Sequence, residues 1–308
     1  MKWNQPDIQD LLKRLQLPQG VVDMVLDTDT YNEVDDQFAL CYALCSPERI
    51  NMLAVYAAPF HNDRSTGPED GMVKSYNEIV RLLGAMGKQA EGFVFEGSRG
   101  YLPEGDGYVD SPAARDLVKK AMARTPDNPL FVVAIGAITN VASAIRMEPA
   151  IVDKIHVIWL GGNPLTWTTA REFNLMQDVP AACTVFDCGC AVTLVPCLGV
   201  ASHLLATIPD VRAYLGGKNE MCDALVELFC AYTDDEFGWA KEIWDVSAIA
   251  CLTMPGAVPT VLEPSPILSM DCRWSRDASR HPIRVVQFAN RTAIFRDMYA
   301  KLAKGYQG

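Results

Sequence analysis

The sequence predicts a single α/β domain with an open, mostly parallel, Rossmann-like sheet and extra helices near the C-terminus. Short β-branched apolar runs alternate with segments of helical periodicity over most of the 308 residues, and this order is typical of parallel sheets flanked by helices. Neither an internal repeat nor a low-complexity linker divides the chain. Residues 1–308 are therefore expected to form one domain, with residues 1–20 as a short N-terminal helical extension.

Apolar runs mark the expected strands, and the later part of the chain is expected to be mainly helical. The strands are expected at Val21–Leu26, Met52–Ala58, Phe93–Glu96, Leu130–Ile135, Ile155–Leu160, Ala191–Pro196, Ile267–Met270 and Arg284–Phe288. The helices are expected at Val34–Leu44, Met72–Leu83, Pro112–Ala123 after an N-cap at Ser111, from Thr139, and at Ala181–Asp187, Met221–Thr233, Glu236–Leu252 and Asn290–Leu302. In such sheets, ligands bind beyond the carboxyl ends of the strands.

The composition excludes several classes of partner. The formal net charge is -11, whereas proteins that bind nucleic acids or anionic membranes present basic surfaces. No apolar run is long enough to cross a bilayer and the N-terminus lacks a secretory pattern, so a cytoplasmic location is expected. The ten cysteines include no CxxC pair, which favours reduced, mostly buried thiols.

Four acids gather after the first expected strand. Asp27 and Asp29 end that strand, and Asp35 and Asp36 open the next helix. Repulsion among four carboxylates is costly unless a cation lies between them. Oxygen ligands without histidine or cysteine favour Ca²⁺ or Mg²⁺. A helix dipole could explain Asp35 and Asp36 alone, but it does not explain the two acids at the strand end.

The acidic run also resembles two other motifs. An EF-hand loop does not fit, because Tyr31 and Asn32 stand where a ligand and a glycine are needed. A Mg²⁺-dependent phosphatase of the haloacid dehalogenase type also begins with a strand ending in Asp-x-Asp. From the pattern alone, this phosphatase is the main alternative, although Tyr31 replaces the Thr or Val that is usual four positions after the first acid.

The chain resembles the inosine–uridine-preferring nucleoside hydrolases in four blocks that occur in the family's order. These blocks are the Asp-x-Asp and Asp-Asp pairs, Ile135-Gly-Ala-Ile-Thr-Asn, Glu172-Phe-Asn and Trp244-Asp245; Val200-Ala-Ser-His is a weaker fifth. The loop between the acid pairs is two residues longer than is usual in the family. The resemblance implies the nucleoside hydrolase fold and the hydrolysis of a ribonucleoside to free base and ribose.

The resemblance also implies residue roles. Carboxylates of Asp29, Asp36 and Asp245 and the carbonyl of Ile135 would bind Ca²⁺, and Asp27 would support them. Asp29 would also act as the general base for the attacking water. The residues expected to bind the sugar hydroxyls are Asp35, Glu172, Asn174 and Asn62. The resemblance further implies a homodimer or homotetramer.

The part of the site that meets the base departs from the family. Trp244 replaces the family's histidine before the late aspartate, which favours purine nucleosides bound by stacking. Trp167 is expected as a second ring, Asn163 as a replacement for a family asparagine, and His61 as a further residue near the substrate. Loss of that histidine also leaves open a protein that binds nucleosides or ribose with calcium but does not hydrolyse them.

Overall fold

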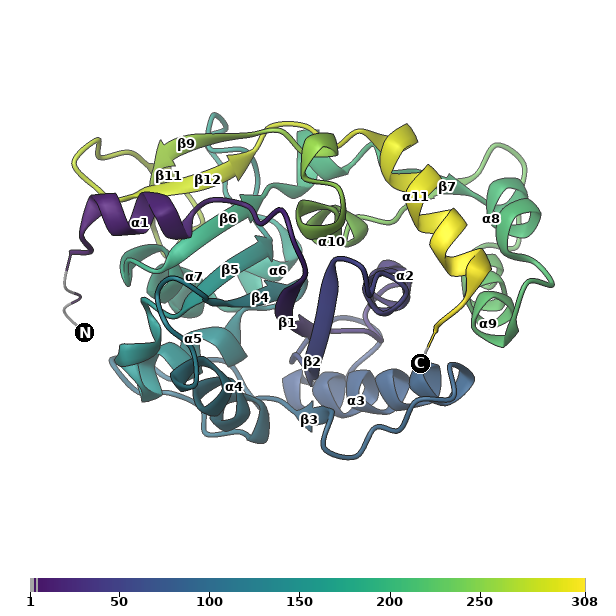
Figure 1. Ribbon diagram of the computed structural model, residues 1–308, viewed down its shortest axis with the longest axis horizontal. Helices are drawn as coiled ribbons and strands as arrows, with labels where there is room; N and C mark the ends of the chain where they lie inside the picture. Colours follow the sequence, from purple (N-terminus) through teal and green to yellow (C-terminus); the bar gives the residue numbers. More distant parts are fainter. Residues whose placement is uncertain (1–2, 4, 308) are drawn as a thin grey trace.

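The computed structural model describes residue 3 and residues 5–307, and it contains an eight-stranded sheet in the order β3-β2-β1-β4-β5-β6-β12-β9. All neighbouring strands are parallel except β12 and β9, which are antiparallel. Figure 1 shows this twisted sheet with helices on both faces. The predicted fold class is therefore confirmed.

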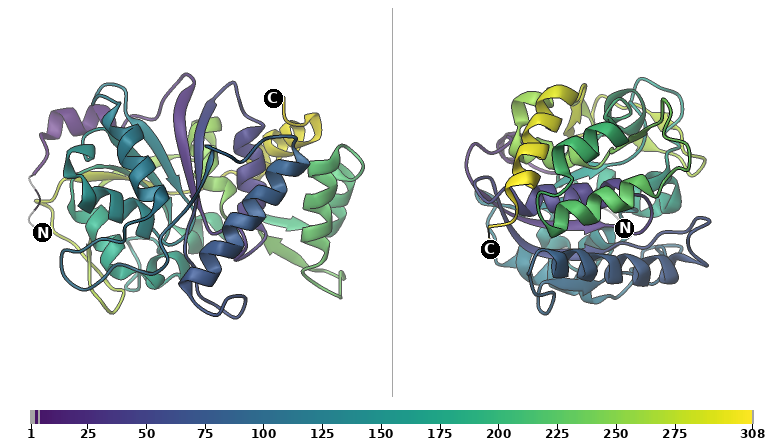
Figure 2. Two further views of the ribbon diagram at one scale, coloured as in Figure 1. Left: turned by 90° about the horizontal axis from the view of Figure 1, so that it is seen from below. Right: turned by 90° about the vertical axis from the view of Figure 1, so that its right-hand side faces the viewer.

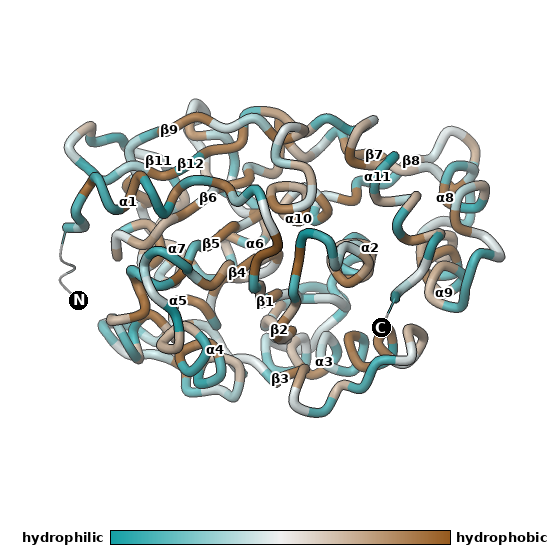
Figure 3. Tube along the Cα trace, in the orientation of Figure 1, coloured by the Kyte–Doolittle hydropathy of each residue, from teal (hydrophilic) through white to brown (hydrophobic). Residues whose placement is uncertain are grey.

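The strands of this sheet are short and mostly apolar. Their bounds are β1 Val22–Thr28, β2 Ile50–Ala57, β3 Val94–Glu96, β4 Leu130–Ala134, β5 Ile155–Leu160, β6 Ala191–Val195, β9 Thr260–Pro264 and β12 Pro282–Val286. Every residue of β4, β5 and β6 is buried, as expected for strands covered on both faces. Figure 3 shows brown, hydrophobic colour along the central strands.

Helices pack on the two faces of the sheet and enclose two separate hydrophobic cores. One core holds side chains of α2 Asp35–Leu44, α3 Pro68–Ala85, α8 Ile208–Leu215, α9 Glu220–Cys230, α10 Val246–Thr253 and α11 Arg291–Lys304. The other holds side chains of α4 Pro112–Met122, α5 Thr139–Met147 and α7 Val179–Asp187. Residues of β1 alternate between them, with Met24 and Leu26 in the first and Val25 in the second.

The N-terminal extension forms α1 Ile8–Arg14, which begins at an Asp7 cap. It lies at one end of the molecule, and α8, α9 and the antiparallel pair β7 Leu205–Thr207 and β8 Ala240–Glu242 lie at the other (Figures 1 and 2). Within the described residues, no helix is long and apolar enough to cross a membrane.

The predicted helix Glu236–Leu252 is wrong in its first half. Gly238 has a φ of 69°, and the residues after it form β8, which pairs with β7 more than thirty residues earlier in the chain. The helix α10 begins only at Val246. This long-range pairing overrides the local helical periodicity, and it takes Trp244 out of the helix interior where packing would be its ordinary role.

The C-terminal third also contains elements that periodicity did not reveal. They are α8, β7, β9 and β11 Trp274–Ser275, and earlier in the chain α6 Phe173–Gln177, besides short turns of helix at Pro149–Ile151, Cys197–Ala201 and Pro255–Ala257. Most are only two to five residues long, which is too short for a periodic signal. The strand predicted at Ile267–Met270 is present as the shorter β10 Ile267–Leu268, which pairs with β11. The antiparallel edge strand β9 closes the sheet beside β12.

Candidate active site

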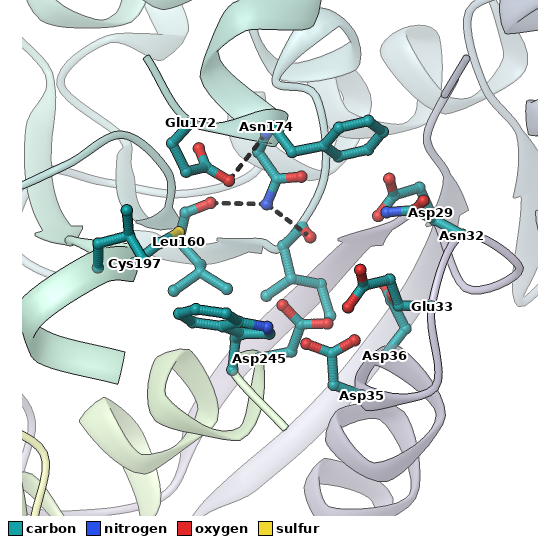
Figure 4. A pocket seen from close by; sticks show the side chains of 14 residues that line it. Asp29, Asn32, Glu33, Asp35, Asp36, Leu160, Glu172, Asn174, Cys197 and Asp245 are labelled. Atoms are coloured by element: carbon teal, nitrogen blue, oxygen red, sulfur yellow. Dashed lines mark hydrogen bonds between the residues drawn. The ribbon is translucent and has the colours of Figure 1, made fainter. Parts of the chain in front are cut away.

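A cavity of about 250 Å³ opens beyond the carboxyl ends of β1, β4, β5 and β6, where the sequence predicted a ligand site. Six separate segments of the chain line it: the loop before α2 with the start of that helix, the residue after β4, the end of β5, the start of α6, the helical turn Cys197–Ala201, and the segment before α10. Figure 4 shows the side chains converging from these elements. The lining residues are Asp29, Asn32, Glu33, Asp35, Asp36, Ile135, Leu160, Glu172, Phe173, Asn174, Cys197, Leu198, Trp244 and Asp245.

The acidic wall of the cavity combines residues from the two ends of the sequence. Asp35, Asp36 and Asp245 are buried and each offers a carboxylate oxygen, with these atoms within 4.8 Å of one another. Thr28 donates to Asp36 Oδ1 at 2.5 Å from the end of β1. Asp29 lies on the same wall, and both of its carboxylate oxygens are buried without a hydrogen-bond partner.

Burial and mutual repulsion penalise the charged forms of these acids. Burial raises the pKa of Asp29 well above its usual value, and the charges of Asp36 and Asp35 add to the effect. Burial likewise raises the pKa of Asp245 and of Asp35. Burial also raises the pKa of Asp36 to about 7, although the Thr28 hydrogen bond opposes it. A bound hard cation would remove this penalty, so the residues fit Ca²⁺ or Mg²⁺.

Asp27 lies behind this wall and does not line the cavity. Asn140, from the first turn of α5, donates to Asp27 Oδ1 at 2.7 Å, while the other carboxylate oxygen is buried without a partner. Burial raises the pKa of Asp27 to about 7, and the Asn140 hydrogen bond lowers it. Its place is consistent with the supporting role predicted for it.

The opposite wall is built around the start of α6. Glu172 caps this helix by accepting hydrogen bonds from the backbone N–H groups of Asn174 and Leu175, and it also accepts one from Gly162. Asn174 Nδ2 donates to the carbonyls of Ile135 and Leu160 at 3.1 and 3.0 Å (Figure 4). The two predicted sugar ligands and the predicted carbonyl ligand therefore form one connected group.

Trp244 lines the cavity directly before Asp245. It is partly buried and packs against the larger core. Because α10 begins after Asp245, the tryptophan lies in the connecting segment rather than on a helix face. The structure thus brings the aromatic ring and the acidic cluster into one cavity.

Four residues predicted at the substrate do not line the cavity. His61 is exposed, and its backbone N–H donates to Gln177 Oε1. Asn62 donates instead to Asn32 Oδ1 at 2.6 Å, so it contacts a cavity residue rather than the cavity. Asn163 is buried and donates to the Arg171 carbonyl. Trp167 is 42% exposed and lines a neighbouring hollow with Gly199, because Gly161 and Gly162 turn the chain after β5.

Six lining residues were not predicted from the sequence: Asn32, Glu33, Leu160, Phe173, Cys197 and Leu198. Leu160 and Cys197 stand at or just after strand ends, so the rule that ligands bind beyond strand ends could have found them. Asn32 and Glu33 belong to the loop between the acid pairs, whose side-chain directions depend on contacts with distant segments.

Comparisons with known proteins agree with this geometry. The model of the family described as inosine-uridine preferring nucleoside hydrolase matches residues 24–295. Pyrimidine-specific ribonucleoside hydrolase RihA of Citrobacter koseri is 27% identical over 255 residues, which are 74% of this chain and 78% of the relative. Non-specific ribonucleoside hydrolase RihC of Escherichia coli is 29% identical over 245 residues, which are 75% of this chain and 78% of the relative.

Solved structures share the fold. The purine-preferring ribonucleoside hydrolase from Gardnerella vaginalis superposes with a TM-score of 0.73 at 21% identity, covering 92% of this chain and 98% of that one. The matched family segment includes the acidic loop, the Glu172 block and Trp244-Asp245. The chain therefore belongs to the inosine-uridine preferring nucleoside hydrolase family and is a hydrolase of N-glycosyl compounds.

Proposed function

We propose that this enzyme hydrolyses purine ribonucleosides in preference to pyrimidine ribonucleosides and that it depends on Ca²⁺. The observation that carries the proposal is the meeting of Trp244 with the buried acids Asp29, Asp35, Asp36 and Asp245 in one cavity. The similar proteins differ in their named preferences, pyrimidine-specific, non-specific and purine-preferring. The preference for purines therefore rests on Trp244.

The acidic wall supports the metal half of the proposal. Asp36, Asp245 and Asp29 would hold the cation, with the Ile135 carbonyl as a further oxygen ligand. Asp35 shares the tight cluster with Asp36 and Asp245, and it would bind either the cation or a ribose hydroxyl. When bound, a divalent cation supplies a water molecule of lowered pKa and attracts vicinal hydroxyl groups.

Five residues that line the cavity then have distinct parts in the proposed reaction. The water oxygen would form a bond to the anomeric carbon while the bond from that carbon to the base nitrogen breaks, through an oxocarbenium-like state. The base would leave with the electron pair of that bond and take up a proton from solvent. Asp29 takes the proton of the water, since its oxygens have no other donor. Asp35, Glu172 and Asn174 would hold the sugar hydroxyls. Trp244 would stack on the base and favour the wide purine ring.

A panel of ribonucleosides tests the proposal. The enzyme should release base and ribose faster from inosine, adenosine and guanosine than from uridine and cytidine, and a chelator should stop the reaction until Ca²⁺ is restored. A faster reaction on pyrimidines would reject the purine preference, and full activity in chelator would reject the calcium requirement. Calorimetric binding of nucleosides without release of base would instead support a binding protein, which the absence of histidine from the described cavity wall motivates.

A homodimer or homotetramer and a cytoplasmic location remain predictions from the sequence. Light scattering coupled to size-exclusion chromatography would measure the number of subunits directly.

A further inference from the structure

Glu33 lines the cavity beside the four buried acids of the acidic wall, and the proposed metal site does not use it. It comes from the five-residue loop between Asp29 and Asp35. Its side chain is 40% exposed, whereas Asp29, Asp35, Asp36 and Asp245 are exposed by 1–3%. Figure 4 shows Glu33 on the same side of the pocket as these acids.

Glu33 separates the reaction cavity from a second, outer groove. The groove has a volume of about 380 Å³ and is lined by Glu33, Val34, Gln37, Arg64, Leu228, Ala231 and Tyr232. Glu33 is thus a wall residue that a substrate meets at the edge of the catalytic cavity. The residues that contact the Glu33 carboxylate differ from those that contact the buried acids.

Lys241 holds one oxygen of Glu33. The Lys241 Nζ atom is paired with Glu33 Oε2 across 208 positions of sequence, and the lysine side chain is only 15% exposed. The same Nζ lies 5.6 Å from the centroid of the Tyr232 ring. Lys241 belongs to β8, the strand that leads directly to Trp244 and Asp245, so the ion pair joins the two parts of the chain that form the acidic wall.

The residues on the N-terminal side of Glu33 are held as well. Arg64 lies over the Tyr31 ring at 4.8 Å and the Tyr232 ring at 5.9 Å, and it donates to the Tyr232 hydroxyl at 3.1 Å. Asn62 donates to Asn32 Oδ1 at 2.6 Å. The loop is therefore constrained at Glu33 itself and on its N-terminal side, which lowers the entropy that a contact with a ligand costs.

The second oxygen of Glu33 remains free. Among the described residues, Oε1 has no hydrogen-bond partner, while Oε2 is occupied by Lys241. A charged acceptor that is held in place at a binding cavity selects ligands that present a donor. It also repels ligands that carry an anionic group.

We propose that Glu33 is a specificity-determining residue whose free oxygen accepts a hydrogen bond from a hydroxyl or amino group of the bound nucleoside, and that Lys241 is the positioning residue that holds it. The inference rests on the proposed function, because it concerns the substrate of the same cavity. The ligand class is a neutral nucleoside with a hydrogen-bond donor outside the ribose diol.

Pairs of substrates that differ by one donor test Glu33. Inosine and its 5′-deoxy analogue differ by the primary hydroxyl group, and adenosine and purine riboside differ by the exocyclic amine. For each pair, the ratio is kcat/KM of the substrate with the donor divided by kcat/KM of the substrate without it. In Glu33→Ala, this ratio should fall by about tenfold in at least one pair, which is the contribution of a hydrogen bond to a charged group. Glu69→Gln is the control, because Glu69 is paired with Arg99 on the exposed surface.

The positioning role of Lys241 is tested by measuring how its substitution changes KM and kcat separately. Lys241→Met should raise KM for the donor-bearing substrate more than it lowers kcat, and Lys241→Arg should restore KM. Lys301→Met is a matched control. Lys301 is 17% exposed, pairs with Glu48 and Asp297, and lies 5.4 Å from the Tyr42 ring centroid. Equal melting temperatures of the variants would show that they fold.

The proposed function and the proposed role of Glu33 would be rejected by different results. If the wild-type enzyme hydrolyses no ribonucleoside, the proposed function itself is wrong. If the wild type is active and Glu33→Ala keeps the wild-type ratio within both pairs, only the role of Glu33 is wrong. An equal loss of kcat/KM on every substrate would likewise overturn the role of Glu33, because a residue that only supports the structure would not distinguish substrates with a donor from those without one.

Discussion

The Asp29 carboxylate has no hydrogen-bond donor, unlike the carboxylates of Asp27 and Asp36. Thr28 donates to Asp36, and Asn140 donates to Asp27, whereas both oxygens of Asp29 are buried without a partner. A buried carboxylate without a donor is costly, so Asp29 is stabilised by a cation or a proton. This property supports its proposed role as the general base.

Asp29→Asn is therefore expected to remove most of the activity. The amide cannot accept the proton of water, and the loss of a general base typically costs 10²–10⁴-fold. Initial rates at saturating Ca²⁺ and nucleoside would measure the fall in kcat. Asp63→Asn, in an exposed loop position, is the control and should keep the wild-type kcat; a fall below tenfold in Asp29→Asn would assign the base elsewhere.

Trp244→Ala should reduce activity on purines more than on pyrimidines. A stacked aromatic pair contributes roughly 0.5–1.5 kcal/mol beyond area burial, so the extra loss for purines should be about two- to tenfold. The measurement is kcat/KM for inosine and uridine in both proteins. Equal losses on the two substrates would mean that Trp244 supports the wall by packing and does not stack on the base.

At the scale of elements, α5 secures the ends of three strands. Its Asn140 side chain accepts from the Ser98 backbone N–H after β3, and it donates to Asp27 in β1 and to the Ala57 carbonyl at the end of β2. Gly97 allows this approach, because a Cβ atom there would lie 2.5 Å from Asn140 Nδ2. One buried amide thus aligns the strand ends from which the acidic wall rises.

Asn140→Ala should lower the free energy of unfolding by about 2–4 kcal/mol, because it leaves several buried polar groups without partners. Urea denaturation at a fixed Ca²⁺ concentration would measure the change. Asn290→Ala removes the side-chain N-cap of α11 and should cost about 1 kcal/mol. Equal losses in the two variants would show that the Asn140 network is no more than a helix cap.

At the scale of the whole molecule, the acidic wall joins segments more than two hundred residues apart. Asp35 and Asp36 begin α2, and Asp245 precedes α10, which packs against α2. Without a cation, carboxylates so placed repel one another. A bound cation attracts all of them and so holds the two segments together. Metal binding and the stability of the fold should therefore be coupled.

Ca²⁺ should accordingly raise the melting temperature, and a chelator should reverse the rise. At a concentration 100 times the dissociation constant, a cation that binds only the folded state adds about 2.7 kcal/mol of stability. Differential scanning calorimetry would record the shift. Asp245→Asn should lose most of it, while Asp63→Asn should keep it; a shift of wild-type size in Asp245→Asn would place the cation elsewhere.

Local chemistry determined the fold class and the acidic half of the site. The apolar runs predicted β1, β2, β4, β5 and β6 to within three residues at either end, because buried parallel strands are continuous apolar segments. Asp29 and Asp36 could be placed at one sheet edge, since a strand end and the following helix start are close in sequence. Asp35 joined them for the same reason.

Only the tertiary structure decided which other side chains complete the cavity. The pairing of β7 with β8 takes Trp244 out of a helix, where it lines the cavity, and the ion pair of Glu33 with Lys241 spans 208 positions. The turn after β5 keeps Trp167 and Asn163 away from the cavity. Periodicity reports only neighbours within a few residues, whereas these positions depend on contacts between segments that meet only when the sheet has formed.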